Sequence, residues 1–413
     1  MFAKTRKLFR RTFESGTGAG AFLASALCFG MAFGSFYGVL NNYLVQIQHF
    51  NEYDRGILEF FRETPGLFLI VILALMHRFS EWKVLRTGLV IGMLASCALM
   101  FVGANRVFLT VLVIFWSAGE HILMPVRNSL SMHLAKPGMQ GRSLGLTSSV
   151  GYTGQLVGAL AAAALFYFGT EKLAAEHPAL LYNLAWLLIG VFLFGSFCCI
   201  ATQKSDIRET VRRPRLYFNR KYFKFYMLEL FYGARKQIFL TFAPFVLILI
   251  YGFDTRKMAL LTGVCAAVNI FAGPLVGKLI DRIGYRNTMI YDTVFLFFVC
   301  LVYGFAPKLF PLEVAYYMVI ANYIFDAVIS NASLASSIYV KAISDTPDEV
   351  TSTLTTGISI NHLISVLAAL AGGWIWREFG VGVLFTFAAV MAVCNTLYAI
   401  TIPKSQFQNS LRR

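Results

Sequence analysis

Charged side chains are scarce in this chain: Asp, Glu, Lys and Arg make up 14% of its 413 residues, while apolar residues make up 57%. A water-soluble protein of that composition would aggregate, and the balance is typical of a protein that has lipid as its solvent. The seven cysteines lie inside apolar runs and show no CxxC spacing, which indicates small buried side chains rather than disulfides or metal ligands. We therefore expect no metal and no cofactor.

Sequence signatures of soluble enzymes are also missing. The chain has no HExxH, no GxSxG, no Walker loop and no GxGxxG that opens a βαβ unit. The net charge of +15 resides mainly in short segments between apolar runs, where Lys and Arg face anionic lipid. We expect neither an enzyme nor a nucleic-acid-binding protein.

Long apolar runs make up most of the sequence. Each is long enough to cross about 30 Å of hydrocarbon as a helix that rises 1.5 Å per residue. The first run is too long for a cleaved signal peptide, so we expect it to be retained as a helix. These runs predict an all-α membrane protein with twelve transmembrane helices, near residues 20–46, 56–76, 84–104, 107–133, 143–169, 179–200, 222–250, 257–279, 287–305, 311–339, 351–374 and 380–402.

The distribution of cations predicts the orientation. Most of the 36 Lys and Arg residues fall in the two tails and in every second loop, while the other loops hold few, including Arg55, Arg106 and Arg256. By the positive-inside rule, both termini lie in the cytoplasm. We expect an integral protein of the plasma (inner) membrane.

One long basic loop divides the chain into two halves. TSSVG at 147–151 and TTGIS at 355–359 occupy the same place in the fifth and eleventh predicted spans, which indicates duplication. The predicted parts are a cytoplasmic N-tail, a six-helix bundle, a basic cytoplasmic linker, a second pseudo-symmetric six-helix bundle and a cytoplasmic C-tail, at residues 1–19, 20–200, 201–221, 222–402 and 403–413. Gly151, Gly154 and Gly158 in the fifth span indicate close helix packing.

A family resemblance appears in GPLVGKLIDRIGYRNTM, residues 273–289. It resembles the loop 8–9 signature of the major facilitator superfamily, roughly G-x-L-x-D-R-x-G-R-[RK], through Gly277, Asp281, Arg282, Gly284 and Arg286. The resemblance implies a secondary transporter that works by alternating access, in which these five residues form a gating motif.

The acidic loop DTPDE at 345–349 offers Asp345 and Glu349 as partners for the arginines of this motif. The corresponding loop of the first half has His77 and Ser80 where Asp and Gly are expected, so the motif is incomplete there.

Polar residues inside the predicted spans mark the candidate site, because intramembrane charges are costly and must face protein or water. They avoid the middles of spans three, six and twelve, which the resemblance implies are lipid-facing. We expect a proton-coupling or charge network of Glu63, Glu120, His121, Arg127, Glu229, Asp326 and His362. We expect substrate contacts from Arg235, Lys236, Arg62, Gln155, Asn269, Tyr232 and Trp116.

Arg235 and Lys236 stand side by side in LELFYGARKQIFL. An unpaired cation at the bilayer centre costs roughly 2.5–3.5 kcal/mol, so the pair requires compensation. Three interpretations stay open: contact with a substrate anion or a gate, a structural salt bridge with Asp326 or Glu120, or a span that begins only at Ile238. Glu59 and Glu63 lie three residues before and one after Arg62, which predicts that Arg62 holds acids of its own helix.

Together with these residues, the resemblance implies a monomeric secondary transporter, coupled to protons; the cations near the middle of the membrane favour a small organic anion or zwitterion as its substrate. The alternative is proton-driven efflux of amphipathic or cationic compounds, a drug or metabolite exporter. In that case Glu63, Glu120 or Asp326 binds the cargo and the basic pair is neutralised structurally.

Overall fold

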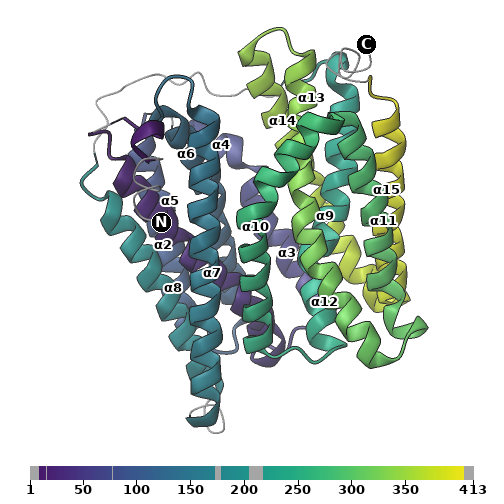
Figure 1. The fold of residues 1–413 in the computed structure, drawn as a ribbon. Helices are drawn as coiled ribbons and strands as arrows, with labels where there is room; N and C mark the ends of the chain where they lie inside the picture. Colours follow the sequence, from purple (N-terminus) through teal and green to yellow (C-terminus); the bar gives the residue numbers. More distant parts are fainter. Residues whose placement is uncertain (1–8, 15, 77, 173–177, 204–216, 404–413) are drawn as a thin grey trace. The chain divides into compact units, whose positions relative to one another are not determined.

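The structure is a computed structural model that describes residues 9–14, 16–76, 78–172, 178–203 and 217–403. Within these residues almost the whole chain is helical (Figure 1). The longer helices are α2 (Ala19–Gln46), α3 (Glu52–Leu67), α4 (Leu69–Leu75), α5 (Glu81–Ala98), α6 (Arg106–His133), α7 (Gln140–Lys172), α8 (Pro178–Ile200), α9 (Phe223–Leu249), α10 (Thr255–Ile283), α11 (Tyr285–Leu309), α12 (Leu312–Ile329), α13 (Leu334–Ile343), α14 (Pro347–Phe379) and α15 (Val381–Ile400).

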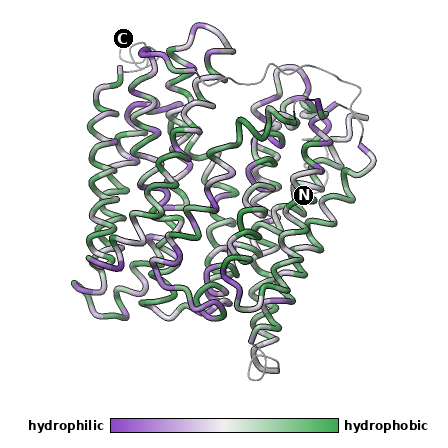
Figure 2. Tube along the Cα trace, turned by 180° about the vertical axis from the view of Figure 1, so that it is seen from behind, coloured by the Kyte–Doolittle hydropathy of each residue, from purple (hydrophilic) through white to green (hydrophobic). Residues whose placement is uncertain are grey.

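The apolar length of these helices suits a membrane. Among the described residues, nine helices are long and apolar enough to span it, or ten if the pair Thr255–Gly273 and Leu275–Ile283, bent by 41°, is one span. Apolar residues cover most of the length of these helices (Figure 2). α3 and α9 fall on the predicted spans 56–76 and 222–250, but both carry several charged residues. The predicted all-helical membrane fold is confirmed.

The helices form two compact units. The first comprises the described residues of Met1–Gln48, Phe68–Val211 and Asp254–Ile270. The second comprises those of His49–Leu67, Arg212–Phe253 and Phe271–Arg413. Compared with the two predicted halves of the sequence, α3 therefore joins helices of the second half, and the start of α10 joins helices of the first.

Glycines hold α3 against α14 in the second unit. A Cβ atom on Gly56 would lie 2.6 Å from the carbonyl oxygen of Ala369 and 3.0 Å from the Cα atom of Gly373. Only a residue without a side chain allows the two backbones to approach so closely. This contact places the charged residues that follow Gly56 beside the second-half helices.

Glycines also join α2 and α7 in the first unit, as the sequence predicts for the fifth span. A Cβ atom on Gly158 would overlap the backbone of Met31, and one on Gly154 would overlap the carbonyl oxygen of Leu27. The Ser35 hydroxyl donates a 2.8 Å hydrogen bond to the Gly158 carbonyl oxygen across this contact.

Gly158→Ala tests this packing against Gly151→Ala in the same helix. The first adds a methyl group against the Met31 backbone, whereas the second meets nothing within 4 Å. We expect Gly158→Ala to lower the free energy of unfolding by about 1–3 kcal/mol. Gly151→Ala should be neutral or stabilise by up to about 1 kcal/mol, because alanine favours the helix. Thermal unfolding in detergent measures both; equal midpoints would contradict the close contact.

Candidate functional site

Four charged side chains of α3 bind one another. The Arg62 guanidinium donates to Glu59 Oε2 and Oε1, each at 2.7 Å, and is also paired with Glu63. Arg55 Nη1 donates to Glu59 Oε2 at 2.6 Å. All four side chains are buried. The prediction that Arg62 holds acids of its own helix is confirmed.

The predicted place of Arg55 in an outer loop is wrong. α3 begins at Glu52, before the apolar run starts, and Arg55 is only 3% exposed. The helix extends this far because Arg55 and Glu59 are one turn apart and neutralise each other. Hydropathy does not register such internal pairing.

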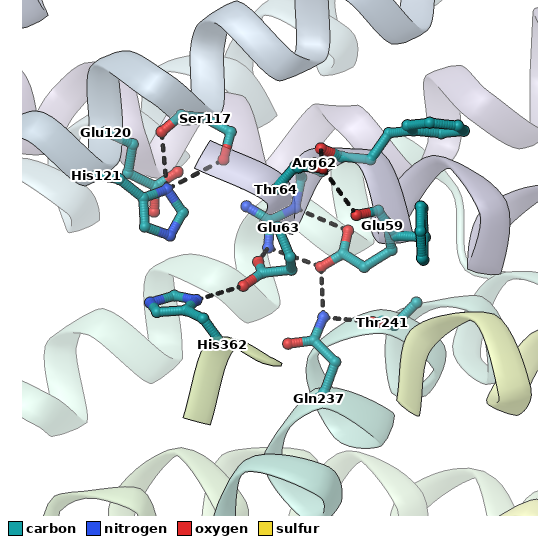
Figure 3. Close-up of polar contacts among 12 residues, drawn as sticks. Glu59, Arg62, Glu63, Thr64, Ser117, Glu120, His121, Gln237, Thr241 and His362 are labelled. Carbon is teal, nitrogen blue, oxygen red and sulfur yellow. Dashed lines mark hydrogen bonds and ion pairs between the residues drawn. The ribbon is translucent and has the colours of Figure 1, made fainter. Parts of the chain in front are cut away.

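This charged cluster extends from α3 to two other helices of the same unit (Figure 3). Gln237 of α9 donates to Glu59 Oε1 at 2.6 Å and to Thr241 Oγ1 at 3.0 Å. His362 Nδ1 of α14 lies 3.0 Å from Glu63 Oε2. The two arginines and two glutamates cancel in charge, so the net charge of the set depends on whether His362 is protonated. We call Arg55, Glu59, Arg62, Glu63, Gln237 and His362 the α3 network.

Gln237 was not among the residues predicted from the sequence. It has no charge, and nothing in its spacing marks it apart from other polar residues of the span. Its role follows from the position of α3, which brings a carboxylate within reach of its amide.

Arg235 forms the salt bridge that one interpretation of the sequence anticipated. Its Nη1 donates to Asp326 Oδ1 at 2.8 Å, and its side chain is 2% exposed. The guanidinium also lies 5.4 Å from the ring centre of Tyr232. The Arg235 Nε and Nη2 atoms have no partner among the described residues.

Asp292 of α11 is a further acid that acts on the Arg235 guanidinium. Its Oδ1 atom is buried and has no hydrogen-bond partner in the described structure. One arginine therefore faces two carboxylates here.

Lys236 differs from its neighbour. Its side chain is half-buried, and none of the described residues holds it by an ion pair or hydrogen bond. Adjacent residues on a helix point about 100° apart, so Lys236 does not share the Asp326 contact. α9 begins at Phe223, so both cations lie inside one continuous helix, and the interpretation in which the membrane span starts at Ile238 stays a prediction.

Glu229 is held by neutral donors. The Ser336 hydroxyl donates to Glu229 Oε1 at 3.1 Å, and the Asn361 amide donates to Oε2 at 3.3 Å. These contacts tie α9 to α13 and α14. Lys236 of the same helix also acts on this carboxylate electrostatically, without forming an ion pair with it.

In the first unit, Glu120 and His121 bind side chains of their own unit. Tyr37 OH donates to Glu120 Oε2 at 2.8 Å. His121 Nδ1 lies 2.8 Å from the Ser117 carbonyl oxygen and 3.1 Å from its hydroxyl (Figure 3). Arg127 lies 5.5 Å from the ring centre of Phe29.

Three further residues of the first unit were predicted to contact substrate, and of these Trp116 lies in an apolar environment. Trp116 is 2% exposed and stacks on Phe36 with ring centres 3.9 Å apart, as in a packed core. Gln155 on α7 and Asn269 on α10 are half-buried. The predicted site residues are thus distributed over both units.

The gating motif forms a helix–turn–helix. α10 ends at Ile283, Gly284 has a φ of 80°, and α11 begins at Tyr285. Glycine tolerates this left-handed φ without strain. Arg286 Nη2 donates to the Ile400 carbonyl oxygen at 2.8 Å, while Asp281 and Arg282 are exposed.

The predicted partners of these arginines, Asp345 and Glu349, bind other groups. Asp345 Oδ2 lies 2.6 Å from Lys221 Nζ, and Glu349 accepts hydrogen bonds from Tyr222 OH and the Asp345 backbone N–H, at 3.0 and 2.9 Å. The Asp345 hydrogen bonds raise the pKa of Lys221 and lower that of Glu349. The pairing with Arg282 and Arg286 is wrong because the residues before α9 fold against this loop.

Comparison with known proteins places the fold. The model of the Major Facilitator Superfamily matches residues 22–358. The crystal structure of nucleoside transporter NupG has a TM-score of 0.72 at 11% identity and covers 93% of this chain and 98% of its own. A D-xylose–proton symporter has a TM-score of 0.71 at 14% identity, covering 94% and 98%.

A third solved structure, a bacterial homolog of the human lysosomal transporter Spinster in an inward-facing and occupied conformation, has a TM-score of 0.68 at 14% identity and covers 94% of this chain and 96% of its own. At these identities the likeness concerns the fold alone. No curated protein matches the chain.

The Arg235–Asp326 pair can be tested by a variant cycle. Arg235→Met leaves Asp326 buried without its partner, and we expect it to lower the free energy of unfolding by about 3–5 kcal/mol. Arg235→Met with Asp326→Asn should recover much of this loss. Lys236→Met, the matched control next to it, should change stability little. Thermal unfolding of the purified variants would refute the bridge if the double variant were no more stable than Arg235→Met.

Proposed function

Because the chain belongs to the major facilitator superfamily and is a secondary transporter, we propose that it couples the movement of protons to that of a small organic anion or zwitterion. The observation that supports proton coupling is the 3.0 Å contact between Glu63 and His362. The two helices that it joins, α3 and α14, come from opposite halves of the sequence.

A proton on His362 changes what this contact contributes. With His362 protonated, the contact is a charge-assisted hydrogen bond, which is roughly twice as strong as a neutral one. Without that proton the imidazole is neutral and holds the Glu63 carboxylate less tightly. Binding or release of a proton therefore alters the free energy that holds α3 to α14. Alternating access requires helices of the two halves to separate, which connects the proton to the transport cycle.

Lys236 is the proposed substrate contact. Arg55, Arg62 and Arg235 each bind a carboxylate of the protein, at 2.6–2.8 Å. Lys236 has no such pair among the described residues, and its half-buried ammonium suits a carboxylate or phosphate of a small solute. In this proposal Arg235 positions α9 against α12 and is not the leading contact.

The second candidate function, efflux of amphipathic or cationic compounds, is favoured by one observation. The Arg235–Asp326 salt bridge is the structural neutralisation that this alternative expects of the basic pair. An acid such as Glu120 then takes the place of Lys236 as the contact with cargo.

A ligand screen by thermal shift separates the two functions. The panel contains dicarboxylates, amino acids and the lipophilic cation tetraphenylphosphonium. We expect an anion or zwitterion to stabilise the wild type, by about 2.7 kcal/mol at 100-fold its dissociation constant. Lys236→Gln should lose this response, and the exposed control Lys308→Gln should keep it. A response confined to tetraphenylphosphonium, retained by Lys236→Gln and lost in Glu120→Gln, supports export instead.

Proton coupling is tested in proteoliposomes with the compound that stabilises the protein. A pH-sensitive dye inside the vesicles reports protons that enter with the solute. We expect Glu63→Gln and His362→Gln to reduce proton entry at least about tenfold, because each removes one side of a titrating contact. Exchange of labelled for unlabelled solute should continue. His133→Gln is the control, since His133 binds Glu81 at a more exposed position.

Proton entry at the wild-type rate in both Glu63→Gln and His362→Gln would refute this coupling site. A loss of proton entry together with a loss of exchange and of thermal stability would indicate damage to the fold, and the stability of each variant is therefore measured beside its transport.

A further inference from the structure

A pocket lies at the start of α9, and none of its lining residues belongs to the candidate site. It has a volume of about 540 Å³ and is lined by Arg220, Lys221, Phe223, Lys224 and Tyr339. Three of these five residues are cations, and none of them takes part in the proposed transport.

The positive charge of this pocket is only partly neutralised. Lys221 binds Asp345 at 2.6 Å, and the raised pKa that follows from this hydrogen bond keeps its ammonium charged. Lys224 Nζ donates to the Thr401 carbonyl oxygen at 2.7 Å, which leaves its charge in place. Arg220 is exposed and has no ion pair with any residue that the structure describes.

The start of the helix is already satisfied by protein groups. The 3₁₀ turn Arg220–Tyr222 leads into α9, and the Asn219 side chain accepts a hydrogen bond from the Lys221 backbone N–H. The charge of the pocket therefore rests on its side chains, where three cations stand against two carboxylates, Asp345 and Glu349, the second of them 3.8 Å from Lys221. This balance favours a ligand with negative charge.

Aromatic residues distinguish a lipid from a soluble anion. Phe223 lines the pocket and is 51% exposed, and Phe218, close by in sequence, is 70% exposed. Cations beside exposed aromatic rings at the end of a long, mainly apolar helix match the boundary between head groups and acyl chains. A soluble anion would account for the cations but not for the exposed rings.

We propose that this pocket binds the phosphate of an anionic phospholipid, with Arg220 and Lys221 at the phosphate and Phe223 against the start of the acyl chains. The bound lipid holds the first turn of α9 against Tyr339 of α13. This site does not depend on the proposed substrate or on proton coupling.

The test uses the full chain in nanodiscs of phosphatidylcholine with or without phosphatidylglycerol. Native mass spectrometry measures retained phosphatidylglycerol, and thermal unfolding measures its effect. We expect the double variant Arg220→Gln, Lys221→Gln to retain it about thirtyfold more weakly. The control, Lys308→Gln with Arg377→Gln, makes the same change in net charge at two other exposed cations and should behave as the wild type.

Soluble phosphates identify the source of the ligand. Inorganic phosphate and glycerol 3-phosphate are added to protein in phosphatidylcholine nanodiscs. We expect no stabilisation by either, and we expect Phe223→Ala to weaken retention of phosphatidylglycerol. If the soluble compounds stabilise the wild type as well as the lipid does, the pocket is a soluble-phosphate site. Equal lipid retention by the double variant and the wild type would also overturn the proposal.

Discussion

Neutralisation of buried charge is the constraint on which the arrangement of the second unit depends. Four of the charged side chains of α3 are buried, and none of these four is more than 5% exposed. Each of these would cost several kcal/mol if buried alone, and spacings of three and four residues let the helix satisfy them internally. Gly56 then brings this neutral set against α14, and His362 of α14 and Gln237 of α9 complete its hydrogen bonds. Charge pairing within α3 and close packing at Gly56 therefore both determine the position of α3 against α14.

The need to neutralise buried charge also determines which cations are available to bind a solute. A solute that binds Arg62 or Arg235 must compete with a carboxylate that is already in place, and removing it exposes that acid to an apolar surrounding. Lys236 forms no ion pair among the described residues and acts on Glu229 only at longer range, so a solute that binds it displaces no carboxylate. The sequence cannot separate Arg235 from its neighbour, because both are cations near the middle of one span. Only the structure shows that Asp326 of α12 pairs with Arg235 and not with Lys236.

Features that depend on local spacing were predictable. Hydropathy located the helices, and the interval between Glu59 and Arg62 predicted their contact within α3. Contacts between helices were not predictable in this way: Gln237 carries no charge, and Asp345 meets Lys221 rather than Arg282 because of how the linker end folds. The prediction that Arg55 lies in a loop was wrong for a related reason. It was inferred from the charge of Arg55, which Glu59 neutralises within the helix.

The charge balance of the α3 network also determines whether an anionic or a cationic solute binds more favourably together with the proton. Its two arginines and two glutamates sum to zero, so a proton on His362 gives the set one positive charge. In the low dielectric of the interior, this charge attracts an anion held by Lys236 on the neighbouring α9 and repels a cation. By reciprocity, an anion favours the bound proton as much as the proton favours the anion. Joint binding of the two predicts movement in the same direction, whereas a cationic cargo would compete with the proton and predict exchange.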